Sequence, residues 1–483
     1  MDPAIPPGGR VSGRRLATLL GNWRSGGSRH GAADLAAGIE LLVLDGRLPA
    51  GTRLPAEREM AESIAISRTM VAAALETLRD EGLVASRRGA GSWITAPAVD
   101  RPAEHPAQPN VIDFGRAVPP AIHGVTAAFD AARLRLCEEL GRHGYEELGR
   151  ADLRARIAER YTARGLPTSP EQVMVTNGAH HAFVLALRTL AGPGDRVLVE
   201  QPTYPNALDA IRAAHAVPVP VAMDENGWDL PAFDAVLRQA NPRLAYLIVD
   251  FHNPTGLRLD EAGRERLART LRKARTVAVV DETQVELDLE GEPEDGPRPL
   301  AAFAEDWTIT VGSAAKSHWG GFRLGWVRTS AELQHRMIAA RPSIDLGSPL
   351  VEQLVLAELM ARCESPLRGR RAELRVKRDL LVDALKNNCP QWTFNAPEGG
   401  LSLWCWLPAP VGTRIAVAAA NHGIRLPPAS RFGVHGGLER RVRLHWALDE
   451  EAITDSVRRL ATAAASVRSD VALLDNDQVV PVV

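Results

Sequence analysis

Lysine is scarce in this sequence of 483 residues. Only four of its 57 basic residues are lysines, and they are Lys273, Lys316, Lys377 and Lys386. Because arginine supplies almost all of the positive charge, a lysine in an unusual sequence context is a candidate for a chemical role. Cysteine is equally scarce: the four cysteines stand far apart without a CxxC pair, which argues against a disulfide framework and a zinc site. We expect a reducing compartment and no metal site.

Long apolar runs are missing as well. No stretch reaches the roughly 18 apolar residues that a membrane span requires, and the opening residues MDPAIPPGGR lack the apolar core of a signal peptide. The net charge of −2 neither favours nor excludes a polyanionic partner. We therefore expect a cytoplasmic protein without a membrane partner, and the length suggests more than one domain.

One proline-rich stretch divides the chain. Residues 96–110, APAVDRPAEHPAQPN, show no apolar periodicity and are predicted to form an extended linker between a module at 31–95 and a larger one at 111–468. Residues 1–30 are predicted to be a flexible arm with a short helix near 16–23. Residues 469–483 are predicted to be a loose tail.

The small module has the pattern of a winged helix-turn-helix. In AADLAAGIELLVLDG the apolar residues Leu35, Ile39, Leu42 and Val43 recur at helical spacing. AEREMAESI predicts a second short helix, and Ser67 is expected to cap a third over RTMVAAALETLRDEG. The second and third helices meet across a tight turn, which is the helix-turn-helix. The stretch LVASRRGAGSWIT then predicts two strands around a basic turn, which form the wing.

The placement of arginine in this module favours DNA binding. The start of a recognition helix enters the major groove, so Ser67, Arg68 and Thr69 are the expected base or phosphate contacts. Four further arginines fall at the turn, the second helix and the wing: Arg53, Arg58, Arg87 and Arg88. The alternative is a helical dimerisation or docking module with solvated arginines, since residues 1–95 hold 12 arginines against 10 acidic residues.

This stretch also resembles a known family. The string LPAGTRLPAEREMAESIAISRTMVAAALETLRDEGLVASRRGAGSWIT is similar to the winged-helix domain of GntR-type bacterial transcription regulators. The resemblance covers roughly 65 residues and includes the start of the recognition helix and the basic wing. It implies that the module binds double-stranded operator DNA.

The large module alternates apolar strands with helical segments. EQVMVTNG, DRVLVEQPTY, RLAYLIVDFHNPTG, TVAVVDETQ and WTITVGSAAKS each read as a strand that ends in polar or glycine residues. This alternation predicts an α/β domain with a mainly parallel sheet, whose ligands gather at the carboxyl ends of the strands. We expect a large part at about 140–345 and a smaller α+β part at 111–139 plus 346–468.

Lys316 lies at one of these strand ends, among the small residues of VGSAAKSHWGGFRLGW. A lysine amine forms a Schiff base with an aldehyde, and an aldehyde cofactor built on a pyridine ring needs a carboxylate at its ring nitrogen. Asp281, at the end of another strand, supplies that carboxylate. Lys316 and Asp281 are therefore the candidate catalytic residues.

Other strand-end residues suit the rest of such a cofactor. A phosphate group needs backbone N–H groups at a helix start, a hydroxyl and a fixed positive charge. The candidates are Gly178, Ala179, Ser313 and Arg323. Tyr204 can stack on the ring, Asn253 can donate to its phenolic oxygen, and Arg443 can bind a substrate carboxylate through two hydrogen bonds.

Taken singly, these residues have simpler interpretations. Asp281 can cap the next turn, Arg443 can belong to a surface ion pair, and Tyr204 can serve packing. Lys316 can be solvated, and the NPTG sequence can be no more than a turn. The hypothesis depends on the joint order of the motifs along the chain.

That order resembles fold-type I aminotransferases across nearly all of residues 111–465. The matching pieces are TNGAHHA, PTYP, HNPTG, VVDE, SAAKSHWGGFRLGW and RVRLHW. The resemblance implies pyridoxal 5′-phosphate, with Lys316 as the attachment lysine and Asp281 at the pyridine nitrogen. It gives the phosphate, ring and carboxylate residues the roles described above, and it implies that Tyr145 reaches the phosphate in the partner subunit.

One position departs from that family. A tyrosine usually stands two or three residues after the strand aspartate, and here those positions hold Thr283 and Gln284. In the family this tyrosine bonds the cofactor's 3′-oxygen. Its absence puts efficient transamination in doubt more than cofactor binding.

The two modules together resemble the MocR subfamily of GntR-type regulators. The resemblance implies a homodimer that binds operator DNA and senses pyridoxal phosphate or an amino compound that reacts with it. One alternative is an active aminotransferase whose N-terminal module only docks or dimerises. Another is a winged-helix regulator with an inert body, although Lys316, Asp281 and Arg323 speak against that.

Overall fold

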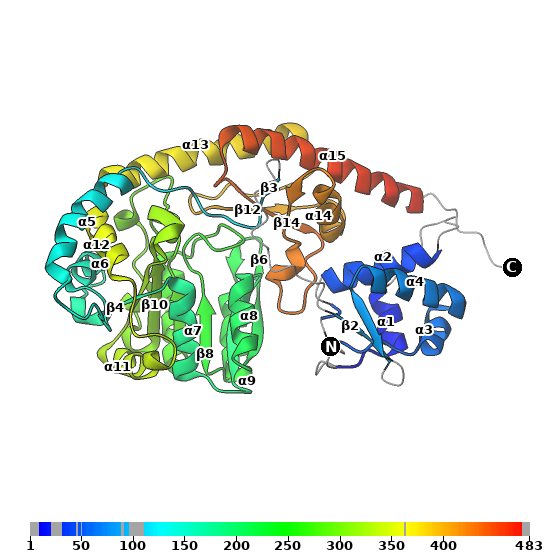
Figure 1. The fold of residues 1–483 in the computed structure, drawn as a ribbon, viewed down its shortest axis with the longest axis horizontal. Helices are drawn as coiled ribbons and strands as arrows, with labels where there is room; N and C mark the ends of the chain where they lie inside the picture. The colour runs from blue at the N-terminus through cyan, green and yellow to red at the C-terminus, as the bar shows by residue number, and fades with distance from the viewer. Residues whose placement is uncertain are drawn as a thin grey trace.

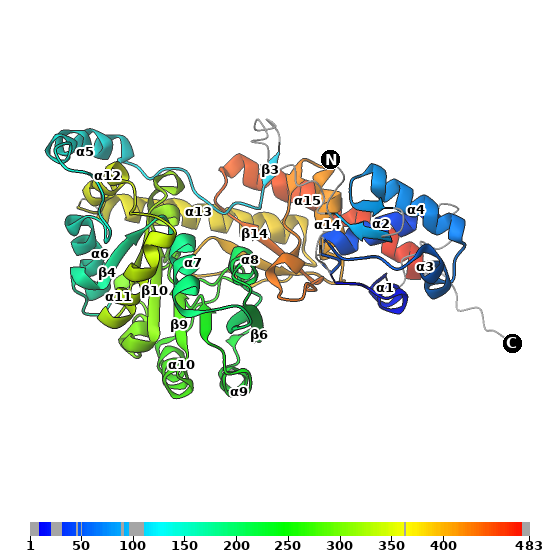
Figure 2. The same ribbon diagram turned by 60° about the horizontal axis from the view of Figure 1, so that its bottom comes forward.

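The structure is a computed structural model that describes residues 9–20, 31–44, 47–49, 51–87, 91–95, 111–361 and 364–475. It has an N-terminal unit and a larger unit built around a sheet (Figure 1). In both views the N-terminal unit lies on the side of the larger unit that carries α14 (Gly412–Ala420) and α15 (Glu450–Asp475) (Figure 2). The predicted linker, 96–110, lies outside the described residues.

The N-terminal unit is the predicted winged helix. Its elements are α1 (Gly13–Leu20), α2 (Gly31–Leu44), α3 (Glu57–Ile64), α4 (Arg68–Asp80), β1 (Val84–Arg87) and β2 (Gly91–Ile94), with β1 and β2 antiparallel. Ser67 caps α4 as expected, because its hydroxyl accepts a hydrogen bond from the Met70 N–H at 3.2 Å. Leu35, Ile39, Leu42 and Val43 are buried together in its core.

The prediction of a flexible arm is wrong for residues 9–20. Leu16 on α1 is fully buried and Val11 nearly so, and both belong to the core of the N-terminal unit. The Glu59 carboxylate on α3 accepts a hydrogen bond from the Gly13 N–H and pairs with Arg10. The apolar face of α1 packs on α3. The Gly- and Arg-rich composition of the arm gave no sign of this contact between distant segments.

The larger unit contains an eight-stranded sheet in the order β4-β11-β10-β9-β8-β5-β6-β7. The strands are β4 (Val173–Thr176), β5 (Arg196–Gln201), β6 (Val217–Asp224), β7 (Gly227–Trp228), β8 (Leu244–Leu247), β9 (Val277–Asp281), β10 (Thr308–Ser313) and β11 (Gly325–Arg328). Strands β6, β5, β8, β9 and β10 run parallel, whereas β11 is antiparallel to both neighbours. The prediction of a mainly parallel sheet is confirmed.

Helices cover both faces of this sheet. They are α6 (Ala151–Ala163), α7 (Ala179–Leu190), α8 (Pro205–Ala213), α9 (Leu230–Ala240), α10 (Glu261–Ala274) and α11 (Ala331–Ala340). Along β5, Val197 and Val199 pack with α7 and α8, while Leu198 between them packs with α9 and α10. Strands that are buried on both faces have continuous apolar sequences. For this reason the central strands could be predicted from the sequence.

The smaller part packs on α13 (Glu364–Asn388), α14 and α15. It contains an antiparallel pair, β12 (Ser402–Trp406) with β14 (Arg441–His445), and a parallel pair, β3 (Ile112–Asp113) with β13 (Ile424–Arg425). Trp446 is fully buried at its centre. The β3–β13 pairing brings the start of the larger unit beside residues about 300 positions later, so 111–117 pass close to the ligand-binding edge of the sheet.

Two predicted boundaries are wrong. Helices α5 (Val125–Glu139) and α12 (Leu350–Ala361) belong to the large part, because Ala128, Ala132 and Leu354 share a core with Ile157 of α6. Helix α15 continues through Asp475, so the predicted tail is helical over 469–475, and 476–483 lie outside the described residues. Among the helices that the structure describes, none is long and apolar enough to cross a membrane.

Candidate functional site

A cavity of about 570 Å³ opens at the carboxyl ends of β4, β5, β8, β9 and β10. Eight of the residues predicted for a cofactor line it: Gly178, Ala179, Tyr204, Asn253, Asp281, Ser313, Lys316 and Arg323. They come from five strand ends that lie far apart along the chain. The parallel sheet therefore brings together what the motifs placed apart, as expected for this fold class.

Lys316 lies in a short π-helical turn, Ala315–Trp319, directly after β10. Its Nζ donates a hydrogen bond to the Ala117 carbonyl at 2.6 Å, so the returning segment 111–117 holds the amine in place. Burial, followed by the charge of Arg443, lowers the pKa of Lys316 to about 8, while Asp281 opposes the shift. A lysine with this pKa is a far better nucleophile at neutral pH than a solvated one.

Asp281 ends β9, and its carboxylate has a fixed orientation. Oδ2 accepts a hydrogen bond from the Tyr246 hydroxyl at 2.7 Å, and Oδ1 accepts one from the Thr283 N–H at 2.9 Å. Burial, and next the charge of Asp281, raise the pKa of Tyr246 well above its usual value, so this tyrosine remains a donor. The aspartate can accept a further hydrogen bond from a ring N–H in the cavity.

The N-terminus of α7 forms the anion-binding end of the cavity. Gly178 precedes the helix with a φ of +100°, and a Cβ there would lie 3.3 Å from Nη2 of Arg323. The Ser313 hydroxyl accepts from the Ala315 N–H at 3.1 Å and donates to the Leu324 carbonyl at 3.3 Å. Free N–H groups at a helix start, a hydroxyl and a guanidinium suit a phosphate group.

Tyr204 and Asn253 line the walls of the cavity. The Tyr204 hydroxyl accepts a hydrogen bond from Nδ2 of Asn206 at 2.9 Å, and burial raises the pKa of Tyr204. The Asn253 side-chain oxygen accepts from the Ser402 hydroxyl of β12 at 3.4 Å. This second contact ties the wall of the cavity to the smaller part.

Arg443 on β14 is only 5% exposed and is incompletely paired. Its Nη2 donates to the Gly115 carbonyl at 3.2 Å, but Nε and Nη1 have no hydrogen-bond partner among the described residues. Burial lowers the pKa of Arg443 to about 10, and its charge in turn acts on Lys316. A buried guanidinium with two unsatisfied donors calls for an anionic ligand such as a carboxylate.

Tyr145 lies apart from the cavity, and the position of the family's tyrosine holds other residues. Tyr145 is 62% exposed and does not line the cavity of its own chain, so its contact with a partner subunit stays a prediction. Thr283 and Gln284 line the cavity where the family has a tyrosine, and Nε2 of Gln284 donates to the Phe251 carbonyl at 2.9 Å. Gln284 carries an amide in place of a tyrosine hydroxyl, and Thr283 supplies the only hydroxyl of this pair.

Several residues that line the cavity were not predicted from the sequence, and three of them carry charged or ring side chains, namely Arg116, His180 and Trp319. Arg116 belongs to the segment that reaches the site through the β3–β13 pairing, a contact without a local signal. His180 and Trp319 fall inside two of the quoted motifs, next to predicted residues. Their rings contact Tyr204 and Phe322 in edge-on arrangements, with centroids 6.4 and 5.3 Å apart, respectively.

The predicted DNA-contacting residues lie on the surface of the winged helix. Ser67, Arg68 and Thr69 are exposed at the start of α4, where the Ser67 and Thr69 hydroxyls are 2.9 Å apart. Arg53 and Arg87 are exposed too, and Arg58 is exposed and pairs with Glu62 at 3.1 Å. Arg88 lies outside the described residues.

Two family models match the sequence. Residues 112–460 match aminotransferase class I and II, and residues 32–94 match bacterial regulatory proteins of the gntR family. A 2-aminoadipate transaminase of Thermus thermophilus is 30% identical over 371 residues, which cover 74% of this chain and 90% of the relative. The probable rhizopine catabolism regulatory protein MocR of Rhizobium meliloti is 26% identical over 464 residues, covering 89% and 93%.

A solved structure shares the fold of the larger unit. It is LysN, the alpha-aminoadipate aminotransferase of Thermus thermophilus, complexed with N-(5′-phosphopyridoxyl)-L-leucine. Its TM-score is 0.68 at 28% identity, and the match covers 74% of this chain and 93% of the neighbour. The fold of the neighbour and the residues of the cavity agree with a pyridoxal phosphate site.

Proposed function

Because this chain belongs to the class I and II aminotransferase family and carries a gntR-family domain before it, we propose a pyridoxal-phosphate-dependent transcription regulator of the MocR type. The winged helix binds operator DNA, and the larger unit senses the cofactor or an amino compound that reacts with it. The observation that carries this proposal is one chain with exposed residues at the start of its recognition helix and a cavity that combines Lys316, Asp281 and Arg323, with the charge of the buried Arg443 acting on Lys316.

The residues of the cavity fit pyridoxal phosphate. The start of α7, Ser313 and Arg323 suit the phosphate, Asp281 suits the ring nitrogen and Lys316 the aldehyde. When bound, the cofactor supplies an aldehyde that reacts with amines and a ring that withdraws electrons. Among the described residues no group of three or more histidine, cysteine or acidic side chains is placed to hold a metal ion.

The chain's own residues select the amino compound. Arg443 offers two unsatisfied N–H donors to a carboxylate, and the low pKa of Lys316 leaves an amine that readily exchanges its proton at neutral pH. Arg116 adds a further positive charge at the wall. These charges favour an effector that carries a carboxylate beside its amine, that is, an amino acid.

The proposal includes a homodimer. Leu134 and Leu140, on and after α5, are 70% and 73% exposed, and Leu346, before α12, is 56% exposed. Apolar side chains so exposed are typical of surfaces that a partner covers. A partner on this side is also what Tyr145 needs in order to reach a second cavity.

The test is a binding titration of the full-length protein on the DNA upstream of its own gene, with and without pyridoxal phosphate. A specific complex whose affinity or footprint changes with the cofactor supports a regulator with a sensor unit. Lys316→Ala is the matched control, because it should bind the same DNA without responding to the cofactor. Absence of a specific complex in every cofactor state would overturn the proposal.

The second candidate is an active aminotransferase. Lys316 and Asp281 in one cavity, with the charge of the buried Arg443 acting on Lys316, favour it. The arginine–pyruvate transaminase AruH of Pseudomonas aeruginosa is 31% identical over 334 residues. The missing tyrosine argues against it, since Thr283 and Gln284 stand at those positions and the Gln284 amide bonds the Phe251 carbonyl. A multiple-turnover assay with panels of amino donors and keto acids separates the two: sustained turnover supports the enzyme, and a single turnover the regulator.

A further inference from the structure

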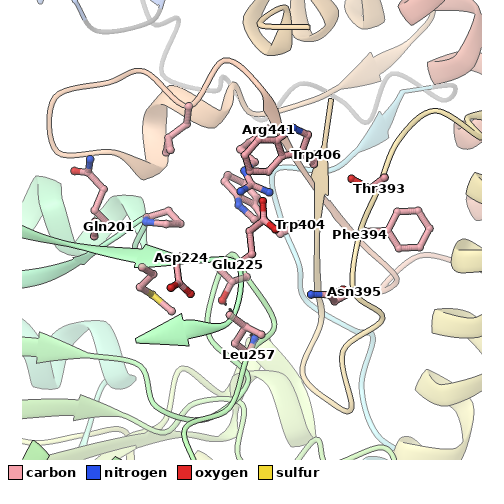
Figure 3. Close-up of a pocket in the computed structure, with 15 residues that line it drawn as sticks. Gln201, Asp224, Glu225, Leu257, Thr393, Phe394, Asn395, Trp404, Trp406 and Arg441 are labelled. Carbon is pink, nitrogen blue, oxygen red and sulfur yellow. Dashed lines mark hydrogen bonds between the residues drawn. The ribbon is translucent and has the colours of Figure 1, made fainter. Parts of the chain in front are cut away.

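A second cleft, of about 380 Å³, lies between the large and the small part (Figure 3). One wall is formed by Asp224 at the end of β6 and by Glu225 in the turn that follows. The other is the small part, with Trp404 and Trp406 on β12 and Arg441 on β14 (Figure 3). None of the assigned cofactor residues lines this cleft, and no lysine is among its lining residues in the described part of the chain.

The small-part wall presents a stacked guanidinium. Trp406 pairs with Arg441 across the β12–β14 ladder, and the Arg441 Cζ lies 3.6 Å from the centroid of the Trp406 ring. Within the described part of the chain, the Arg441 side chain forms no hydrogen bond or ion pair, and burial lowers its pKa. A guanidinium stacked on a ring keeps its N–H edge free for a carboxylate.

Arg441 and Arg443 stand two positions apart on one strand, so their side chains share a face. Arg443 acts on Lys316 in the first cavity, while Arg441 lines the second. Arg441 is therefore open to the second cleft, whereas Arg443 on the same face is buried and lines neither cavity. The two arginines can each bind a separate anionic group.

The opposite wall is acidic. Oδ1 of Asp224 accepts the N–H groups of Asn226 and Gly227 at 2.7 and 3.0 Å, which fixes the turn and leaves Oδ2 available to a ligand. The charge of Glu225 reaches Arg441 and acts to raise its pKa, against the larger effect of burial, yet the two form no ion pair in the described structure. Charges of both signs thus face each other across a gap that a ligand with both charges can fill.

The remaining surface of the cleft is apolar and aromatic. Trp404 is 9% exposed, and its ring contacts the Phe432 ring edge-on. The other apolar lining residues include Phe394, Leu257 and Leu438. Indole faces attract an ammonium group as well as apolar side chains. A volume of this size suits a molecule as large as an amino acid.

We propose that this cleft binds, without covalent reaction, a free amino acid with an aromatic or aliphatic side chain. Its carboxylate bonds Arg441, its ammonium group lies between Asp224, Glu225 and the Trp406 ring, and its side chain packs on Trp404. The site is independent of the cofactor and of the regulator proposal. It is also close enough to report on the first cavity, because Pro202 and Thr255 line it two residues from Tyr204 and Asn253.

The test is equilibrium dialysis of the full-length, pyridoxal-phosphate-loaded protein with radiolabelled L-phenylalanine and L-leucine. The Lys316→Ala variant, prepared free of pyridoxal phosphate, serves as a second background, in which the first cavity holds no aldehyde that could react with the amino acid. We expect saturable binding at one site per chain in Lys316→Ala. Phenylpropionate and phenethylamine, which each lack one charge, should compete at least about tenfold more weakly, as expected when a charged hydrogen-bonding partner is lost.

Three variants decide whether the site is this cleft. Arg441→Gln should weaken binding about tenfold or more and Glu225→Gln by a smaller factor, because each loses a charged partner of the ligand. Arg440→Gln is the matched control: this exposed neighbour bonds the Pro408 carbonyl and should bind like the parent protein. Equal affinity in Arg441→Gln and Arg440→Gln, loss of all binding in Lys316→Ala, or no binding of either amino acid would overturn the proposal.

Discussion

At the scale of single residues, the amine of Lys316 is the group whose environment matters most. With a pKa of about 8, roughly one amine in ten is neutral at pH 7, against about one in three thousand at the ordinary value of 10.5. Burial disfavours the charged form, and Arg443 adds repulsion. Only the neutral amine attacks an aldehyde, so the cavity prepares this lysine for covalent attachment.

The first prediction concerns the pH dependence of that attachment. Because the folded pKa is lowered to about 8, the reactive fraction of Lys316 rises with pH and levels off above that value. The rate at which added pyridoxal phosphate acquires its visible absorption on the apoprotein should follow this curve. Lys316→Ala should remove the absorption while far-ultraviolet circular dichroism stays unchanged, and exposed Lys273→Ala should behave as the parent. A midpoint near the ordinary lysine value of 10.5 would contradict the assignment.

The second prediction concerns Arg443. Its positive charge lowers the pKa of Lys316, so Arg443→Met should move the midpoint of the attachment curve to higher pH. The same variant loses the two unsatisfied donors and should bind amino acids about tenfold or more weakly, while simple amines are little affected. Absorption titrations with an amino acid and with its decarboxylated amine make the comparison. Equal losses for both ligands would remove Arg443 from carboxylate recognition.

Most of the candidate site could be predicted from the sequence, because Lys316, Asp281 and the Gly178 turn each sit in a motif whose chemistry is recognisable at a strand end. Arg116 could not be predicted, since it reaches the cavity through the pairing of β3 with β13. The second cleft escaped for the same reason: Glu225 and Arg441 belong to different parts of the unit and meet only in the folded chain.

At the scale of elements, the apolar runs in the sequence predicted most strands and helices. The predictions failed for elements whose packing partners are distant in the sequence. β6, VPVPVAMD, was missed because its prolines argue against a strand, and it lies near the edge of the sheet, where proline is tolerated. Helix α5 was assigned to the wrong part because its sequence does not reveal that Ala128 packs with Ile157. Helix α1 was expected to be loose, yet its Leu16 is fully buried.

The third prediction concerns helix α4. Arg68 is exposed at the start of this capped helix, where a recognition helix meets base edges. Arg68→Gln should weaken operator binding by about 1–3 kcal/mol if it reads a base. Arg79→Gln, at the other end of α4 and paired with Glu76, is the control and should bind normally. A loss that is equal on specific and random DNA would make Arg68 a phosphate contact.

At the scale of the whole molecule, each winged helix is a weak DNA ligand by charge. Residues 1–95 carry 12 arginines and 10 acidic residues, a net charge of only +2, so counterion release contributes little affinity. The proposed dimer would join two such modules, and the second would then bind its half-site at a high effective concentration. In such a dimer, any change in the larger unit that alters the separation of the two modules would change that gain, and the cavity would control DNA binding by this means.

The fourth prediction follows from this geometry. The protein should bind DNA with two half-sites about a hundredfold or more tightly than DNA in which one half-site is scrambled. Moving one half-site by about five base pairs turns it to the opposite side of the duplex, so the advantage should fall sharply. Saturating pyridoxal phosphate should change the preferred spacing in the parent protein but not in Lys316→Ala. Gel-shift titrations on such a spacing series measure all three effects, and equal affinity for one and two half-sites would show that the modules act singly.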